Sequence, residues 1–147
     1  MKEELNHMQV MFDAKSVNEG FARMVVSAFM MDMNPTLEQL ADVKTAVSEA
    51  VTNAIIHGYN EDESRQIKMC CESHGKELMI QVEDEGVGIC DVEQAMQPFY
   101  TSKPELERSG MGFSFMEAFT DRMEVVSKPG KGTRITLWKY IEEDVEE

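Results

Sequence analysis

The chain has 147 residues, and its formal net charge of −14 argues against general nucleic-acid binding, which needs a cationic surface. We expect one domain over residues 1–147 with no membrane span and no signal peptide, because the sequence lacks an apolar run of about 20 residues and a signal-type N-terminus. The three cysteines, Cys70, Cys71 and Cys90, fit neither a disulfide framework nor zinc spacing, so we expect a reducing, cytoplasmic environment.

The helices and strands are predicted from the spacing of apolar residues and from turn residues between them. In chain order we expect a strand over 8–14, helices over 16–33 and 36–58, strands over 67–73 and 78–83, a short helix over 91–95, a loop over 97–110, a helix over 111–120, strands over 123–127 and 133–140, and a frayed acidic tail over about 141–147. This order predicts an α+β fold, a two-layer sandwich in which helices cover one face of a mixed, mostly antiparallel sheet.

The ends of the two long helices carry sequence signals. Ser16 is the expected N-cap of the first helix, because Glu19 follows it at the spacing of a capping box. The Asn-Pro pair before Thr36 should end this helix. Thr36 should cap the second helix, and Gly58 should end it.

Two polar side chains share one face of the second predicted helix. Glu49 and Asn53 are four residues apart, and His57 follows four residues later near the same face. The apolar side chains of this helix lie more than about 100° away from Glu49. They are Leu40, Val43, Val47, Ala50, Val51 and Ala54. A carboxylate beside an amide offers a base next to an oxygen ligand for a hard cation, although this pattern alone also fits a solvated helix face.

Three glycine-containing motifs follow at the ends of predicted elements. They are Asp84-x-Gly86-x-Gly88, Gly110-Met111-Gly112 and Gly132-Thr133. The first follows a strand, where glycine lets the backbone approach a ligand and the carboxylate can accept a hydrogen bond from an exocyclic amine. The second opens a helix, whose free N–H groups suit a phosphate. Taken singly, each motif also fits an ordinary turn or a flexible loop.

In this order the motifs resemble the N box and the three G boxes of the GHKL ATPase/kinase superfamily. The resemblance implies the Bergerat fold, with ATP beneath a mobile lid. It implies that Asn53 binds Mg²⁺, that Glu49 is the general base, and that Asp84 meets the adenine amine with help from Thr133. The other residues placed around the nucleotide are Gly86 and Gly88 at the adenine, His57, Gly110, Met111 and Gly112 at the phosphates, and Lys103 and Arg108 in the lid, where they would neutralise charge on the γ-phosphate.

Nearly the whole chain is similar to one branch of this superfamily, the family of sporulation anti-sigma F factors. The similarity covers residues 48–59 and 101–113 and extends to residues 18–23 of the first helix. Members are homodimers that hold a sigma factor when ATP is bound and phosphorylate a serine on a small anti-anti-sigma protein of the STAS type. The resemblance implies the same partners for this chain, and it implies that Arg23 and Glu19 contact a partner.

Two other functions fit the same motifs. One is a binding module that uses ATP only as a structural ligand, and the other is the ATPase domain of a sensor histidine kinase. Glu49 favours the serine kinase, because a protein that only binds nucleotide needs Asn53 but no base. The short predicted lid, and the lack of a preceding helix pair with a phospho-accepting histidine, argue against the sensor kinase.

Overall fold

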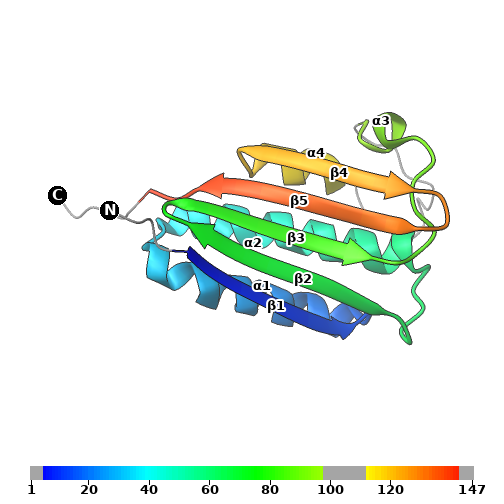
Figure 1. Cartoon of the computed structure of the whole chain (residues 1–147), viewed down its shortest axis with the longest axis horizontal. Coiled ribbons are helices and arrows are strands. Elements are labelled where there is room, and N and C mark those ends of the chain that lie inside the picture. Colours follow the sequence, from blue (N-terminus) through cyan, green and yellow to red (C-terminus); the bar gives the residue numbers. More distant parts are fainter. Residues whose placement is uncertain (1–4, 98–111, 143–147) are drawn as a thin grey trace.

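The computed structural model of the protein describes residues 5–97 and 112–142 (Figure 1). Five strands form one sheet in the order β1-β2-β3-β5-β4. They are β1 (Leu5–Asp13), β2 (Gln66–His74), β3 (Glu77–Asp84), β4 (Arg122–Lys128) and β5 (Gly132–Tyr140). All four neighbouring pairs are antiparallel, so the sheet that we expected to be mixed has no parallel pair in the described part of the chain.

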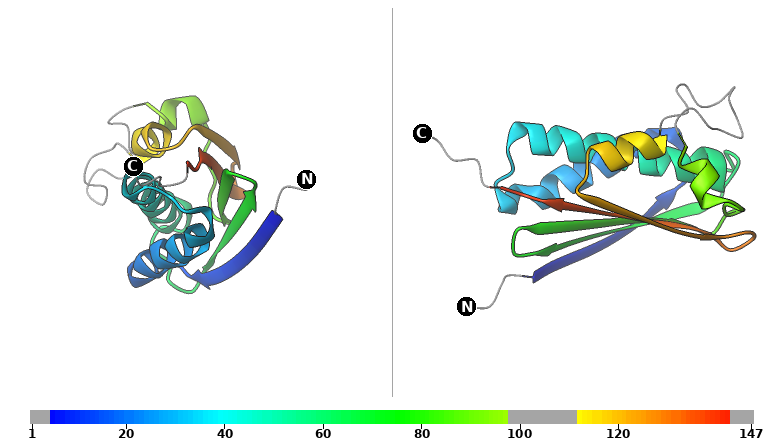
Figure 2. Two further views of the ribbon diagram at one scale, coloured as in Figure 1. Left: turned by 90° about the vertical axis from the view of Figure 1, so that its left-hand side faces the viewer. Right: turned by 90° about the horizontal axis from the view of Figure 1, so that it is seen from above.

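The helices lie together on one face of this sheet, as Figure 2 shows. They are α1 (Ser16–Met30), the 3₁₀ turn η1 (Met31–Met33), α2 (Leu37–Asn53), the π-helix η2 (Ala54–Gly58), the short α3 (Val92–Ala95) and α4 (Gly112–Ala118). The α2 helix packs against both α1 and α4. The predicted two-layer α+β architecture is therefore confirmed. None of the described helices is both long and apolar enough to cross a lipid bilayer.

A hydrophobic core fills the space between the helices and the sheet. Along β2 and β3 the side chains alternate between buried and more exposed, which is the pattern of strands with one covered face. The core side chains of the two layers include Val43, Val47 and Val51 of α2, Ile67 and Met69 of β2, Leu78 and Ile80 of β3, Ile135 and Leu137 of β5, and Met116 of α4. Each such aliphatic side chain contributes about 1.5–3 kcal/mol on burial.

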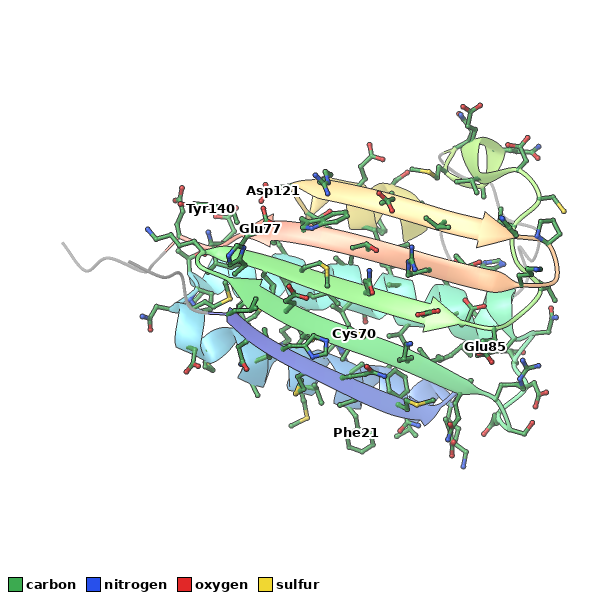
Figure 3. The ribbon with its side chains drawn as sticks, in the orientation of Figure 1. Phe21, Cys70, Glu77, Glu85, Asp121 and Tyr140 are labelled. Carbon is green, nitrogen blue, oxygen red and sulfur yellow. The ribbon has the colours of Figure 1, made fainter. Side chains whose placement is uncertain are left out.

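The opposite face of the sheet carries polar and isolated apolar side chains, including Cys70 (Figure 3). Lys68 forms an ion pair with Glu83 across β2 and β3, with 3.5 Å between the charged atoms. The Arg122 guanidinium lies over the ring of Trp138 at 3.7 Å from its centroid. All three cysteines are unpaired, as expected from their number and spacing.

The helix ends agree with the sequence signals at Thr36 but not at Ser16. Thr36 Oγ1 accepts a hydrogen bond from the Gln39 N–H at 3.1 Å, and the Gln39 side chain accepts one from the Thr36 N–H. This capping box confirms the predicted start of α2. The prediction for α1 is wrong, because Lys15 occupies its N-cap position without a side-chain bond. The Glu19 carboxylate is instead engaged by the Ser48 hydroxyl of α2.

The second predicted helix changes its geometry near its end. The α-helix stops at Asn53, and residues up to Gly58 continue as a π-helix. Short π-helical segments often occur at functional sites. At the other end of the chain, Ile141 is fully buried and its N–H donates to the Lys76 carbonyl at 2.8 Å, so it does not belong to the frayed tail. The tail residues from 143 onward lie outside the described part.

Candidate functional site

Asp84 places an almost completely buried carboxylate at the end of β3. Only 4% of the residue is exposed. The carboxylate accepts a hydrogen bond from the backbone N–H group of Gly86 at 2.9 Å, and the nearby Thr133 N–H also favours its charged form. Burial nevertheless raises the pKa of Asp84 to about 6, because the low-dielectric surroundings disfavour the charged form. A carboxylate has about four lone-pair positions, so Asp84 can still accept hydrogen bonds from a ligand.

Glycines let the backbone pack closely around this carboxylate. A Cβ on Gly58, the last residue of η2, would lie 2.7 Å from the Asp84 carboxylate. A Cβ on Gly86 would lie 1.9 Å from the Gly58 carbonyl oxygen. Gly132 has a φ of +87°, and a Cβ there would lie 2.0 Å from the Asp84 carbonyl oxygen. A side chain at Gly86 or Gly132 would force the backbone to move, and one at Gly58 would displace either the Asp84 side chain or the backbone of η2.

The loop after Asp84 is attached to both of its neighbours. The Val87 N–H donates to the Gly58 carbonyl at 2.9 Å, and the Val87 carbonyl accepts from the Gly130 N–H at 2.7 Å. Gly88 has a φ of +74°, and a Cβ on it would meet the Lys128 carbonyl oxygen at 2.0 Å. The predicted glycines therefore shape the site by allowing contact between backbone segments.

Three polar side chains form a row across neighbouring strands. Asp84 of β3 is paired with Thr133 of β5, and Thr133 is paired with Ser127 of β4. Thr133 is 4% exposed, and its hydroxyl lies 2.8 Å from the hydroxyl of Ser127. Ser127 also accepts a hydrogen bond from the Ile89 N–H at 2.7 Å, so it joins the loop after Asp84 to the β4–β5 hairpin.

Tyr59 connects three elements around the same carboxylate. Its hydroxyl donates to the Gln66 carbonyl at 2.6 Å and accepts from the Glu85 N–H at 2.7 Å. Arg65 lies over the Tyr59 ring at 4.8 Å and donates to the Glu85 carbonyl at 2.9 Å. Burial raises the pKa of Tyr59 above its ordinary value, so the hydroxyl keeps its proton. Figure 3 shows Glu85 at the end of the sheet where β3 finishes.

Glu49 and Asn53 lie on α2 as the helical spacing predicts. The apolar side of the helix is buried, whereas Glu49, Asn53 and His57 are each partly exposed. Asn53 is the last residue of α2, and η2 then leads directly to Gly58, which touches Asp84. The fold thus brings the end of the helix that carries these side chains to the end of β3.

The remaining predicted site residues fall into three places. Gly112 is the first residue of α4 and is partly buried. Glu19 and Arg23 lie one turn apart on α1, with 3.4 Å between Glu19 Oε1 and Arg23 Nε. The lid residues lie outside the described part of the chain; they are Lys103, Arg108, Gly110 and Met111. Within residues 5–97 and 112–142, no three His, Cys, Asp or Glu side chains gather as a metal site, so the Mg²⁺ assignment stays a prediction.

Comparison with known proteins places the chain in a family. A family model described as a histidine kinase-like ATPase domain matches residues 12–139. An anti-sigma F factor of Clostridium perfringens is 58% identical over 134 residues, which cover 91% of this chain and 96% of the relative. An anti-sigma F factor of Shouchella clausii is 52% identical, over an alignment that covers 92% of this chain and 93% of the relative. The chain belongs to the anti-sigma F factor family.

Solved structures of more distant proteins share the fold of this anti-sigma F family member. The crystal structure of the RsbU and RsbW domains of a Mycobacterium tuberculosis protein matches with a TM-score of 0.66 and 18% identity, over 92% of this chain and 32% of that one. The histidine kinase domain of a blue-light activated kinase from Erythrobacter litoralis matches with a TM-score of 0.56 and 18% identity, over 84% and 60% of the two chains. At these identities the likeness concerns the fold alone.

The structure adds residues to the site that the sequence did not single out. Ser127 and Tyr59 contact the site through hydroxyl groups, and Gly58 touches the Asp84 carboxylate directly. Gly58 had a signal in the sequence, because it follows the helix that carries Glu49 and Asn53. Its position suggested only a helix end. Ser127 and Tyr59 had no signal, because their contacts arise from strand register and from the path of the chain after η2.

Proposed function

We propose that the protein is an ATP-dependent anti-sigma factor that holds a sporulation sigma factor inactive and phosphorylates a serine on the STAS-type anti-anti-sigma protein opposing it. The observation that carries this proposal is the buried Asp84 carboxylate in its glycine-lined surroundings. It is supported by 58% identity to an anti-sigma F factor over 91% of the chain. We also propose that residues 1–147 form one domain and that the protein is a cytoplasmic homodimer.

The surroundings of Asp84 suit the edge of an adenine base. The carboxylate is held by the Gly86 N–H group, and its remaining lone pairs can accept from an exocyclic amine. Burial strengthens such a hydrogen bond, because water competes poorly in a low-dielectric site. Gly58 and Gly86 let the backbone of η2 and of the loop after β3 pack closely against each other and against this carboxylate.

Phosphoryl transfer depends on charge neutralisation and alignment more than on covalent chemistry by the protein. Asn53 would hold Mg²⁺ through its side-chain oxygen, and the bound ion would neutralise phosphate charge. Glu49, one helical turn before Asn53, would accept the proton of the incoming serine hydroxyl. General-base help of this kind accelerates a reaction by roughly 10²–10⁴-fold.

The residues nearest the phosphates complete the proposal. His57 follows Asn53 on the same helix end, and the Gly110-Met111-Gly112 motif ends at the first residue of α4. We assign the phosphates to His57 and to the N–H groups of this motif. Lys103 and Arg108 would neutralise charge on the γ-phosphate from the lid.

Incubation with ATP labelled on its γ-phosphate tests the proposal. The reaction contains the purified protein, Mg²⁺ and a candidate STAS-type protein, and phosphoamino-acid analysis identifies the product. We expect label on serine, and none when the acceptor serine of the STAS-type protein is replaced by alanine. ATP binding with no transfer to the correct partner would favour a binding module, and label on histidine would favour a histidine kinase.

A further inference from the structure

Ser127 occupies a position next to the candidate adenine site that neither the sequence motifs nor the family resemblance assigned. It stands in register with Thr133, which stands in register with Asp84, so the three residues form one row across β4, β5 and β3. Paired residues of neighbouring strands point to the same face of a sheet. The row therefore ends with the Asp84 carboxylate on one side and the Ser127 hydroxyl on the other.

The hydrogen bonds of Ser127 restrict where its single proton can go. Its oxygen accepts from the Ile89 N–H at 2.7 Å. Its proton can reach either the Gly132 carbonyl, at 3.0 Å, or the Thr133 hydroxyl, at 2.8 Å. When the proton goes to Thr133, the Thr133 hydroxyl is free to donate its own proton to a ligand. When it goes to Gly132, Thr133 donates to Ser127 and offers only lone pairs to a ligand.

We propose that Ser127 is a positioning residue that orders the Thr133 hydroxyl as a donor to the ring nitrogen of adenine beside the amine. The proposal rests on the adenine assignment made above for Asp84. The amine of adenine lies between the N1 side and the N7 side of the base, and a base that turns its N1 side towards β5 brings N1 near Thr133, the strand partner of Asp84. That nitrogen, N1, accepts hydrogen bonds. The chain of donors then runs from Ile89 through Ser127 and Thr133 to the base, and each hydroxyl both donates and accepts.

The test combines a protein variant with a ligand in which one ring nitrogen is replaced. The dissociation constants of ATP and of 1-deazaadenosine triphosphate, in which a C–H group replaces N1, are measured for the wild type and for Ser127→Ala. We expect Ser127→Ala to weaken ATP binding by roughly 5-fold, the usual scale of one hydrogen bond, and to change binding of the deaza analogue by less than about 2-fold. Ser127→Thr keeps a hydroxyl and should restore the wild-type preference for ATP.

Two controls separate positioning from a structural role. Ser73→Ala removes a partly exposed serine hydroxyl from β2 and should leave both constants unchanged. Ser127→Cys replaces the hydroxyl with a poor donor of similar size. If Ser127→Ala fails to fold, the two dissociation constants are measured for Ser127→Cys instead. Equal weakening of both nucleotides in the Ser127 variants would overturn the positioning role while leaving the proposed function intact. Failure of the wild type to bind ATP would overturn the proposed function itself.

Discussion

Asp84 carries a carboxylate that is buried before any ligand arrives. Its pKa of about 6, against an ordinary value of 3.8, means that the surroundings favour the protonated form more than water does. At neutral pH the buried, ionised carboxylate of Asp84 therefore lowers the stability of the fold. It also gives the site a hydrogen-bond acceptor in a fixed position. Residues of this kind are typical of binding and catalytic sites.

The raised pKa of Asp84 predicts a specific pH dependence of stability. Between the unfolded pKa of 3.8 and the folded pKa of about 6, the native state holds a proton that the unfolded state has lost. The stability contributed by this proton is present at low pH and is lost as pH rises through 6. The free energy of unfolding of the wild type, relative to Asp84→Asn, should therefore fall by roughly 1 kcal/mol between pH 5 and pH 7.5.

Urea denaturation of both nucleotide-free proteins at the two pH values measures this difference. Comparison with Asp84→Asn removes the contributions of the other acidic groups, which are common to both proteins. The same variant should bind ATP and ADP equally poorly, because both nucleotides carry the adenine amine. A stability difference that is independent of pH would show that the Asp84 carboxylate is not desolvated as the structure indicates.

Gly58 should be required for nucleotide binding because of its contact with Asp84. A methyl group at this position would lie 2.7 Å from the carboxylate, so either the side chain or the backbone of η2 must move. We expect Gly58→Ala to weaken ATP binding by roughly 10-fold or more, since a misplaced charged acceptor loses a hydrogen bond of about 1.5–3 kcal/mol. Calorimetric titration with ATP measures the effect.

Gly20→Ala is the matched control for Gly58→Ala. Gly20 lies inside α1, where an added Cβ comes no closer than 3.8 Å to the Arg23 side chain. Alanine is better than glycine in a helix by about 1 kcal/mol, so this variant should be slightly more stable and should bind ATP normally. Equal ATP affinity in both variants would remove the role assigned to Gly58.

At the scale of elements, the site depends on how η2, β2 and the end of β3 are joined. Tyr59 follows η2, and its hydroxyl bonds both to Gln66 at the start of β2 and to Glu85 just after β3. These bonds fix the position of Asp84 relative to the helix that carries Glu49 and Asn53. Together with the bond from the Val87 N–H to the Gly58 carbonyl, the Tyr59 side chain therefore aligns the two halves of the proposed site.

Tyr59→Phe tests this connection. The change removes both hydrogen bonds and leaves the part-buried Glu85 N–H without its acceptor, so we expect a loss of about 1–3 kcal/mol in the free energy of unfolding. Denaturation by urea measures it. Tyr140→Phe serves as the control, because Tyr140 is 52% exposed and should change stability little. Similar stabilities for the two variants would contradict the connecting role of Tyr59.

The sequence predicted elements and motifs better than it predicted contacts between them. Thr36 and Asp84 were correctly placed, because a capping box and a strand end depend on nearby residues. Ser16 was wrongly predicted as a cap, since a tertiary contact to Ser48 captures the Glu19 side chain. Ser127 contacts Ile89, 38 residues away, and only the path of the loop after β3, which is bonded to the β4–β5 hairpin, creates that contact.

At the scale of the whole molecule, the proposed partner contact is connected to the proposed catalytic helix. Arg23 pairs with Glu19 on α1, and Glu19 is bonded to Ser48, the residue before Glu49 on α2. Another face of α1 exposes large apolar side chains, among them Phe21, which points away from the sheet and helices (Figure 3). Exposed apolar side chains gathered on one face of a helix are typical of interaction surfaces.

Arg23→Ala should separate partner binding from nucleotide binding. Arg23 does not contact Asp84 or its strand partners, so ATP affinity should be unchanged. Capture of the sigma factor should weaken by roughly 10-fold or more, since arginines are frequent energetic anchors of interfaces. Arg134→Ala makes the same charge change on the exposed face of β5 and should capture the sigma factor normally. Normal capture by Arg23→Ala would remove the partner assignment.

Glu49→Gln tests the proposed mechanism most directly. The substitution keeps size, polarity and helix propensity but removes the base, and it leaves Asn53 in place one turn away. With ATP and Mg²⁺ present, capture of the sigma factor should match the wild type, whereas transfer to the serine of the anti-anti-sigma protein should fall by roughly 10²-fold or more. Transfer at a rate near that of the wild type would contradict the assignment of Glu49 as the base. If ATP binding, sigma capture and transfer were all lost, the assignment would also be contradicted, because Glu49 would then be a structural residue.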